Sequence, residues 1–138
     1  MTFKKQQLFD WSQHPDDRIR YFSGHALYTT TFKHKGKPTG KTWLCVPNVK
    51  DIAHVWVNGI DCGIAWTAPY EVNITKALKK GNNLLEIEVV NTWHNALRGA
   101  DRGKSPYVGI WTNAKYRSKG DGLLPAGLLE PITLKIDN

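Results

Sequence analysis

Residues 53–85 read AHVWVNGIDCGIAWTAPYEVNITKALKKGNNLL, and this stretch decides the fold class of the chain. Apolar and polar positions alternate over 53–57, and the pair Asn58-Gly59 follows at once. Such alternation indicates a half-buried strand, and Asn-Gly supplies the positive φ angles that a tight hairpin turn requires. The stretch therefore predicts a strand over 53–57, with Val55 and Val57 on one face, that folds back as a second strand over 60–66.

The second half of the same stretch predicts a short strand, a turn of helix and the start of another strand. Residues 70–74 have strand composition. Thr75 is a favoured N-cap for a helix over 76–80, which Gly81 would end. Residues 83–90 then alternate with period two, which is the pattern of a sheet with one wet face. Its expected inward residues are Leu85, Ile87 and Val89.

Three more segments complete the expected sandwich. Residues 25–33 place Ala26, Tyr28, Thr30 and Phe32 on one face, and 42–46 form a short strand that ends at Pro47. Residues 128–136 close the domain, with Ile132, Leu134 and Ile136 expected inward. A short strand and a turn of helix near Asp16 are expected within 9–24. About seven short strands predict an all-β sandwich of two antiparallel sheets with one or two very short helices, forming one domain over 1–138.

The pattern breaks down over 91–124, which holds several aromatic residues and many charges. A loop of this length without periodicity of its own is uncommon in a compact domain and is usually functional or disordered. Its aromatic content predicts that it is ordered against another surface.

Bulk composition excludes several classes of protein. The chain has 138 residues, 41% hydrophobic and 22% charged, which suits one globular domain with a core of its own. No apolar run is long enough for a membrane helix, and the N-terminal residues lack the apolar segment of a signal peptide. The net charge of +7 is scattered and accompanies no nucleic-acid motif. Neither nucleic acid nor a membrane is therefore expected as a partner.

The two cysteines leave two interpretations open. Cys45 and Cys62 both lie in predicted strands, where a free buried cysteine is common. A disulfide between neighbouring strands is the alternative, and it would fit an exported parent protein.

Three stretches together resemble a known family. They read RIRYFSGHALYTTTF (18–32), VWVNGIDCGIAWTAPYEVNITKALKKGNNLLEIEVVNTW (55–93) and LLPAGLLEPITL (123–134). They resemble the sugar-binding-type, galactose-binding-like β-sandwich domain of glycoside hydrolases. The nearest variant is the C-terminal domain of the family 106 α-L-rhamnosidases, and the corresponding module of family 2 enzymes is related. The resemblance covers roughly residues 9–136.

The resemblance implies a galactose-binding-like jelly roll and a bacterial parent enzyme that cleaves terminal sugars. It also implies that the parent is periplasmic or extracellular, and that these residues are a fragment or C-terminal module of it. The parent's catalytic barrel has no counterpart in this chain. Hydrolysis needs two carboxyl groups facing each other across a bound sugar. Most acidic residues here fall at turns, caps or exposed strand positions, and only Asp101 and Asp121 lie in the aromatic loop. The chain itself is therefore predicted to be non-catalytic.

Aromatic residues at loops are the candidates for carbohydrate binding. Sugar C–H faces stack on aromatic rings, and sugar sites add a few placed polar groups. The alternative for each is packing, either within the domain or against a catalytic domain. The candidate set comprises Trp66, Tyr70, Trp93, Asn95, Arg98 and Trp111.

No cofactor is predicted. The histidines are not spaced as metal ligands, and no glycine-rich phosphate loop is present. A structural calcium ion held by Asp51, Asn48 and backbone carbonyls is the one metal that the resemblance makes conceivable.

The predicted function is that of a non-catalytic accessory or carbohydrate-binding-type domain of a glycoside hydrolase, whose partner is a carbohydrate or the catalytic domain. Two alternatives stay open: an independent lectin-like carbohydrate-binding module, and a protein-interaction sandwich without sugar affinity.

Overall fold

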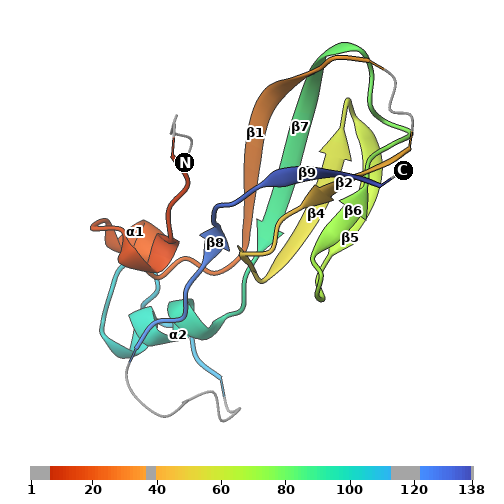
Figure 1. Ribbon diagram of the computed structural model, residues 1–138. Helices are drawn as coiled ribbons and strands as arrows, with labels where there is room; N and C mark the ends of the chain where they lie inside the picture. The colour runs from red at the N-terminus through yellow and green to blue at the C-terminus, as the bar shows by residue number, and fades with distance from the viewer. Residues whose placement is uncertain (1–6, 37–39, 113–121, 138) are drawn as a thin grey trace.

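The computed structural model of the protein describes residues 7–36, 40–112 and 122–137 (Figure 1). Nine strands and three short helices make up these residues. The strands are β1 (His25–His34), β2 (Lys41–Cys45), β3 (Val49–Lys50), β4 (Ile52–Val57), β5 (Ile60–Ala65), β6 (Glu71–Asn73), β7 (Gly81–Val90), β8 (Gly127–Leu128) and β9 (Thr133–Asp137). The helices are the 3-10 turn η1 (Trp11–Gln13), α1 (Asp17–Arg20) and α2 (His94–Asp101). The predicted all-β sandwich is confirmed.

Two antiparallel sheets form the sandwich. The larger has the strand order β1-β7-β4-β5, and the smaller has the order β6-β2-β9. One core cluster joins them, with Leu44 and Val72 from the smaller sheet and Val55 and Ile87 from the larger. A two-stranded ladder of β3 and β8 leads toward the layer that holds α1 and α2 (Figure 1).

The deciding hairpin forms as predicted. β4 and β5 pair around Asn58-Gly59, where φ is 52° and 77°. Both values lie in the left-handed region that Asn and Gly tolerate, so this pair can reverse the chain in two residues. Along β7, Leu85, Ile87 and Val89 are buried as expected.

Two expectations about helices are wrong. The predicted helix over 76–80 is replaced by a turn over 75–77, and the Thr75 hydroxyl that was expected to cap the helix bonds other groups. Its Oγ1 accepts from the Thr42 backbone N–H at 2.8 Å and donates to the Asn73 side chain at 2.6 Å, which ties this turn to β2. The predicted loop over 91–124 instead begins with α2, which buries Ala96 and Leu97.

Two further expectations are corrected. Leu134 and Ile136 lie directly opposite the buried Leu44 and Thr42, and therefore face inward, but β9 is an edge strand and leaves them 40% and 56% exposed. Cys45 and Cys62 are free thiols on strands of different sheets, so the disulfide alternative is wrong.

Within the described part of the chain, no helix has the length and apolar character that crossing a membrane demands.

Candidate functional site

One end of the larger sheet gathers two of the predicted aromatic residues. Because neighbouring strands are antiparallel, β1 and β4 begin at the end where β7 finishes, and the pairing of Ala53 with Ala65 brings the end of β5 there too. Trp66 follows β5 directly, and Trp93 comes three residues after β7. Each is 64% exposed. Sequence positions far apart are thus carried to one end of one sheet.

Exposed aliphatic residues accompany the two tryptophans. Leu27, Ile52 and Ile64 all alternate with inward positions, so they lie on the outer face of the sheet near the same end. Large apolar side chains that gather on a surface mark binding sites more often than isolated ones do. The five residues Leu27, Ile52, Ile64, Trp66 and Trp93 are called the sheet-end residues below.

Short hydrogen bonds fix the backbone that presents Trp93. The Asn91 side chain accepts from the Gly24 N–H and donates to the Phe22 carbonyl, both at 2.8 Å. The Thr92 N–H donates to Asp51 Oδ2 at 3.2 Å. The segment after β7 is therefore tied both to the start of β1 and to the residue before β4, so the tryptophan is exposed on an anchored backbone.

Polar groups lie on the outer face of the same sheet, between the sheet-end residues and the β4–β5 hairpin. His54 stacks on Trp56, with ring centroids 3.9 Å apart, and its Nε2 lies 2.9 Å from Asp61 Oδ1. The hydrogen bond with His54, aided by one from the Gly63 N–H, lowers the pKa of the Asp61 carboxyl. A carboxylate kept ionised in this way accepts hydrogen bonds and is unsuited to donate a proton as a general acid.

The other predicted binding residues have different surroundings. Tyr70 has φ of 54°, is half-buried and packs against the core, so it does not form an exposed platform with Trp66. Asn95 and Arg98 are buried on α2. The Asn95 amide donates to the Leu124 carbonyl and accepts from the Leu124 N–H. Asn95 therefore serves packing within the domain, the alternative to sugar binding. Trp111 is 79% exposed and follows the turn around Tyr107, beyond α2.

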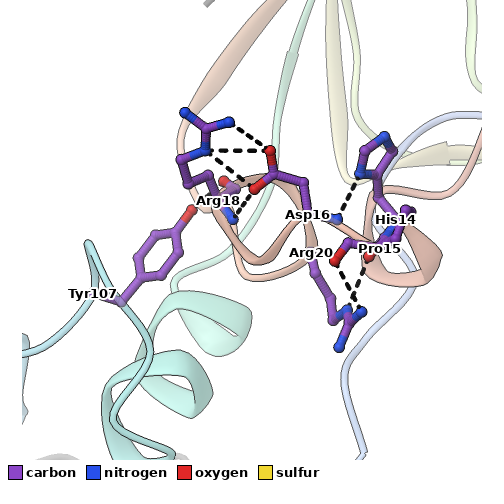
Figure 2. Close-up of polar contacts among 6 residues, drawn as sticks. All are labelled: His14, Pro15, Asp16, Arg18, Arg20 and Tyr107. Atoms are coloured by element: carbon purple, nitrogen blue, oxygen red, sulfur yellow. Dashed lines mark hydrogen bonds and ion pairs between the residues drawn. The ribbon is translucent and has the colours of Figure 1, made fainter.

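A polar clasp around α1 was not predicted from the sequence. Asp16 caps α1 and holds the Arg18 guanidinium through two hydrogen bonds from Nε and one of 2.7 Å from Nη2, while Arg20 donates to the carbonyls of His14 and Pro15 (Figure 2). The Tyr107 hydroxyl donates to the Arg18 carbonyl and so joins α1 to the segment after α2. The sequence signal was the Asp-x-Arg spacing over 16–18, but Tyr107 lies too far along the chain to be assigned to it.

Acidic side chains within the described residues serve the fold in most cases. Asp10 caps η1 and also accepts from the Ala126 N–H, Asp17 pairs with Lys104, and Glu71 pairs with Lys135. Hydrogen bonds from the Arg18 side chain and backbone lower the pKa of Asp16 to about 2, the opposite of what a general acid needs. Asp121, one of the two carboxyl groups in the predicted aromatic loop, lies outside the described residues.

The residues considered for calcium have other partners. The Asn48 amide donates to the Glu130 carbonyl at 2.7 Å, and Asp51 accepts from Thr92. Across the described ranges, no group of three His, Cys, Asp or Glu side chains is placed to hold a metal ion.

Comparison with known proteins identifies the family. Residues 11–119 match the sequence model described as a glycosyl hydrolase 2 galactose-binding domain-like family. The chain belongs to this family. This confirms the predicted resemblance to galactose-binding-like sandwich domains of glycoside hydrolases.

Individual relatives of this galactose-binding domain-like module are much longer than the module. A Formosa agariphila protein provisionally named a beta-glucuronidase is 33% identical over 94% of the chain, which covers 13% of that protein. The solved rhamnosidase from Novosphingobium sp. PP1Y is 41% identical over 91% of the chain, with a TM-score of 0.80, and the module covers 12% of it. A Ruminococcus gnavus beta-glucuronidase shares the fold over 59% of the chain and 14% of its own length, at 20% identity and a TM-score of 0.51.

Proposed function

We propose that this module is a non-catalytic accessory domain of a glycoside hydrolase and packs against a sugar-cleaving catalytic domain that lies outside these residues. The observation that carries the proposal is the length relationship: the module spans 12–13% of two relatives that it matches over more than nine-tenths of its own length. The large exposed apolar side chains, including the sheet-end residues, support it because they offer surface for another domain to cover.

An α-L-rhamnosidase-like parent is the finer proposal. It is supported by the 41% identity to the Novosphingobium rhamnosidase, which exceeds the identity to the two beta-glucuronidases. Location of the parent in the periplasm or outside the cell remains a prediction from the resemblance.

The accessory role is tested by assaying the 138-residue chain on 4-nitrophenyl α-L-rhamnoside and 4-nitrophenyl β-D-glucuronide. We expect no turnover above the blank, whereas the natural polypeptide that contains the module should hydrolyse at least one of them. Deleting the module from that polypeptide should lower its melting temperature. Turnover by the isolated chain at an enzyme-like rate would overturn the proposal.

Carbohydrate binding is a second candidate function, and one observation favours it. Trp66 and Trp93 are equally exposed at one end of the same sheet, whose outer face also carries the hydrogen-bonding groups His54 and Asp61 nearer the β4–β5 hairpin. We propose that a glycan would stack the C–H faces of its sugar rings on these two side chains.

Affinity electrophoresis of the 138-residue chain in gels with rhamnogalacturonan, arabinogalactan or xylan tests this second function. Retardation should be reduced by Trp66→Ala and by Trp93→Ala, and retained in Trp111→Ala, the matched control from a different exposed segment. Equal retardation of all variants, or none by any glycan, would count against a sugar site at the sheet end.

A further inference from the structure

The two sheets leave one side of the sandwich open. β5 and β6 are neighbours at one side, so the other edge strands, β1 of the larger sheet and β9 of the smaller, are left at the opposite side (Figure 1). Within the described ranges, each of these two strands pairs with only one neighbour, β7 and β2 respectively. A row of backbone N–H and C=O groups therefore remains without a strand partner along each edge.

Burial falls steeply toward this side. Inward residues of β7 such as Ile87 and Val89 are fully buried, whereas Tyr28 and Phe32 on β1 are half-buried. All five residues of β9 are exposed, although Leu134 and Ile136 face the same side as the buried Leu44 and Thr42 of β2. Among the described residues, none covers the interior beside β9 as a further strand.

The opening continues below the start of β9 as an apolar recess. This recess has a volume of about 350 Å³ and is lined by Leu8, Glu130, Pro131 and Ile132. Ile132 immediately precedes β9, so the recess and the two exposed aliphatic side chains form a continuous series along the chain, with Ile132, Leu134 and Ile136 at every second residue.

The lysine in the edge strand β9 does not shield the open side of the sandwich. A charged side chain, often lysine, is one of the ways in which proteins discourage pairing at an edge strand. The Lys135 side chain instead lies on the outer face of the smaller sheet, where its Nζ contacts both Glu71 carboxylate oxygens at 3.0 Å and lies 5.8 Å from the Trp43 ring centroid. The edge of β9 keeps its apolar side chains and its backbone accessible.

We propose that β9 accepts an extended segment from the remainder of the parent enzyme, which adds a strand to the smaller sheet. The segment carries apolar side chains at alternating positions, which would cover Ile132, Leu134 and Ile136, while its backbone pairs with β9. A strand fits better than a rounded domain surface, because both the backbone edge and the period-two apolar series need partners. The inference rests on the proposed function, since the rest of the enzyme supplies the segment.

Hydrogen exchange with mass spectrometry tests the proposal on two samples, the 138-residue chain and the natural polypeptide that contains it. We expect amides of 133–137 to exchange at least about tenfold more slowly in the longer polypeptide, because a new ladder would protect them. Leu134→Lys and Ile136→Lys should abolish that protection, and the melting temperature of each isolated variant checks that the module stays folded. Ile60→Lys is the matched control, because Ile60 is an exposed aliphatic residue at the β4–β5 hairpin.

The outcomes separate this inference from the proposed function. Equal exchange of β9 in both samples, with an active hydrolase in the longer one, would overturn the strand proposal and leave the accessory role intact. Slow exchange already present in the isolated chain would also overturn it, and a dependence on protein concentration would assign the cover to a second copy. A longer polypeptide without hydrolase activity on any glycoside would instead contradict the proposed function.

Discussion

The Asn58 side chain donates from Nδ2 to Asn83 Oδ1 at 2.8 Å, which links the tip of the β4–β5 hairpin to the start of β7. Asn58 also donates to the Ala77 carbonyl, and its Oδ1 accepts from the Leu84 N–H. Asn83 is fully buried and bonds the N–H and the carbonyl of Lys79. Two amides therefore tie the β4–β5 hairpin tip and the turn before β7 to the start of β7, in addition to the backbone bond from the Asn58 N–H to the Leu84 carbonyl.

Asn83→Ala is expected to destabilise the protein by about 2 kcal/mol, because it removes a fully buried amide together with its bonds to Asn58 and to the N–H and carbonyl of Lys79. Urea unfolding followed by circular dichroism measures the change. Asn82→Ala is the matched control, since Asn82 is the exposed neighbour. Equal midpoints for the two variants would show that the buried amide contributes nothing to stability.

How far the sequence predicts this fold depends on whether a signal is local. The Asn58-Gly59 turn and the alternation along β7 are local, and both were predicted correctly. The sequence also suggested a helix N-cap at Thr75. That expectation failed because the Thr75 hydroxyl bonds β2, a strand 33 residues away along the chain. A tertiary hydrogen bond replaced the local one.

The candidate site was predicted in part for the same reason. Exposure of Trp66 and Trp93 at one sheet end follows from strand order, which the sequence alone does not reveal. Helix α2 was missed because it is short and contains Gly99, a poor helix former. Position 99 requires glycine because α2 lies against Tyr21: a Cβ atom at this position would lie 2.9 Å from the Tyr21 Cβ. Such close approach between distant segments leaves no periodic pattern in the sequence.

Alanine substitutions at Gly127 and Gly63 distinguish the cost of backbone strain from the cost of a steric clash. Gly127 and Gly63 have nearly equal φ angles, 103° and 102°. A Cβ atom on Gly127 would lie 2.6 Å from Trp11 Nε1, whereas one on Gly63 would meet nothing within 4 Å. Both Ala variants are strained, but Gly127→Ala also displaces a buried indole. We expect Gly127→Ala to be less stable than Gly63→Ala by about 2 kcal/mol, measured by thermal unfolding. Equal losses would mean that the Trp11 side chain moves away at no cost.

The same substitution should lower the stability of the protein much more at Trp11 than at Trp66. Trp11 is 5% exposed, and its Nε1 donates to the Tyr28 hydroxyl at 2.8 Å. Trp11→Phe removes this bond and leaves a void, so a loss of about 2 kcal/mol is expected in urea unfolding. Trp66→Phe should change stability by less than about 0.5 kcal/mol, because the side chain is largely in solvent. A large loss for Trp66→Phe would indicate that its ring has a packing role within this chain.

Acid unfolding should report on the clasp at the start of α1. Hydrogen bonds from the Arg18 side chain and backbone hold the pKa of Asp16 at about 2, against an ordinary value of 3.8. A carboxyl group whose pKa is lower in the folded state contributes stability that is present above the ordinary value and is lost as the pH falls toward the folded value. The contribution of Asp16 is therefore complete above about pH 5 and disappears between pH 4 and pH 2.

Asp16→Asn keeps an oxygen that can cap α1 but removes the charge. Thermal unfolding at a series of pH values should thus show a shallower decline for Asp16→Asn than for the parent chain between pH 4 and pH 2, and the two curves should converge at the acidic end. Arg18→Gln should flatten the same window, because it removes the guanidinium that lowers the pKa. Parallel curves for all three proteins across that window would show that the Asp16–Arg18 pair makes no contribution to stability.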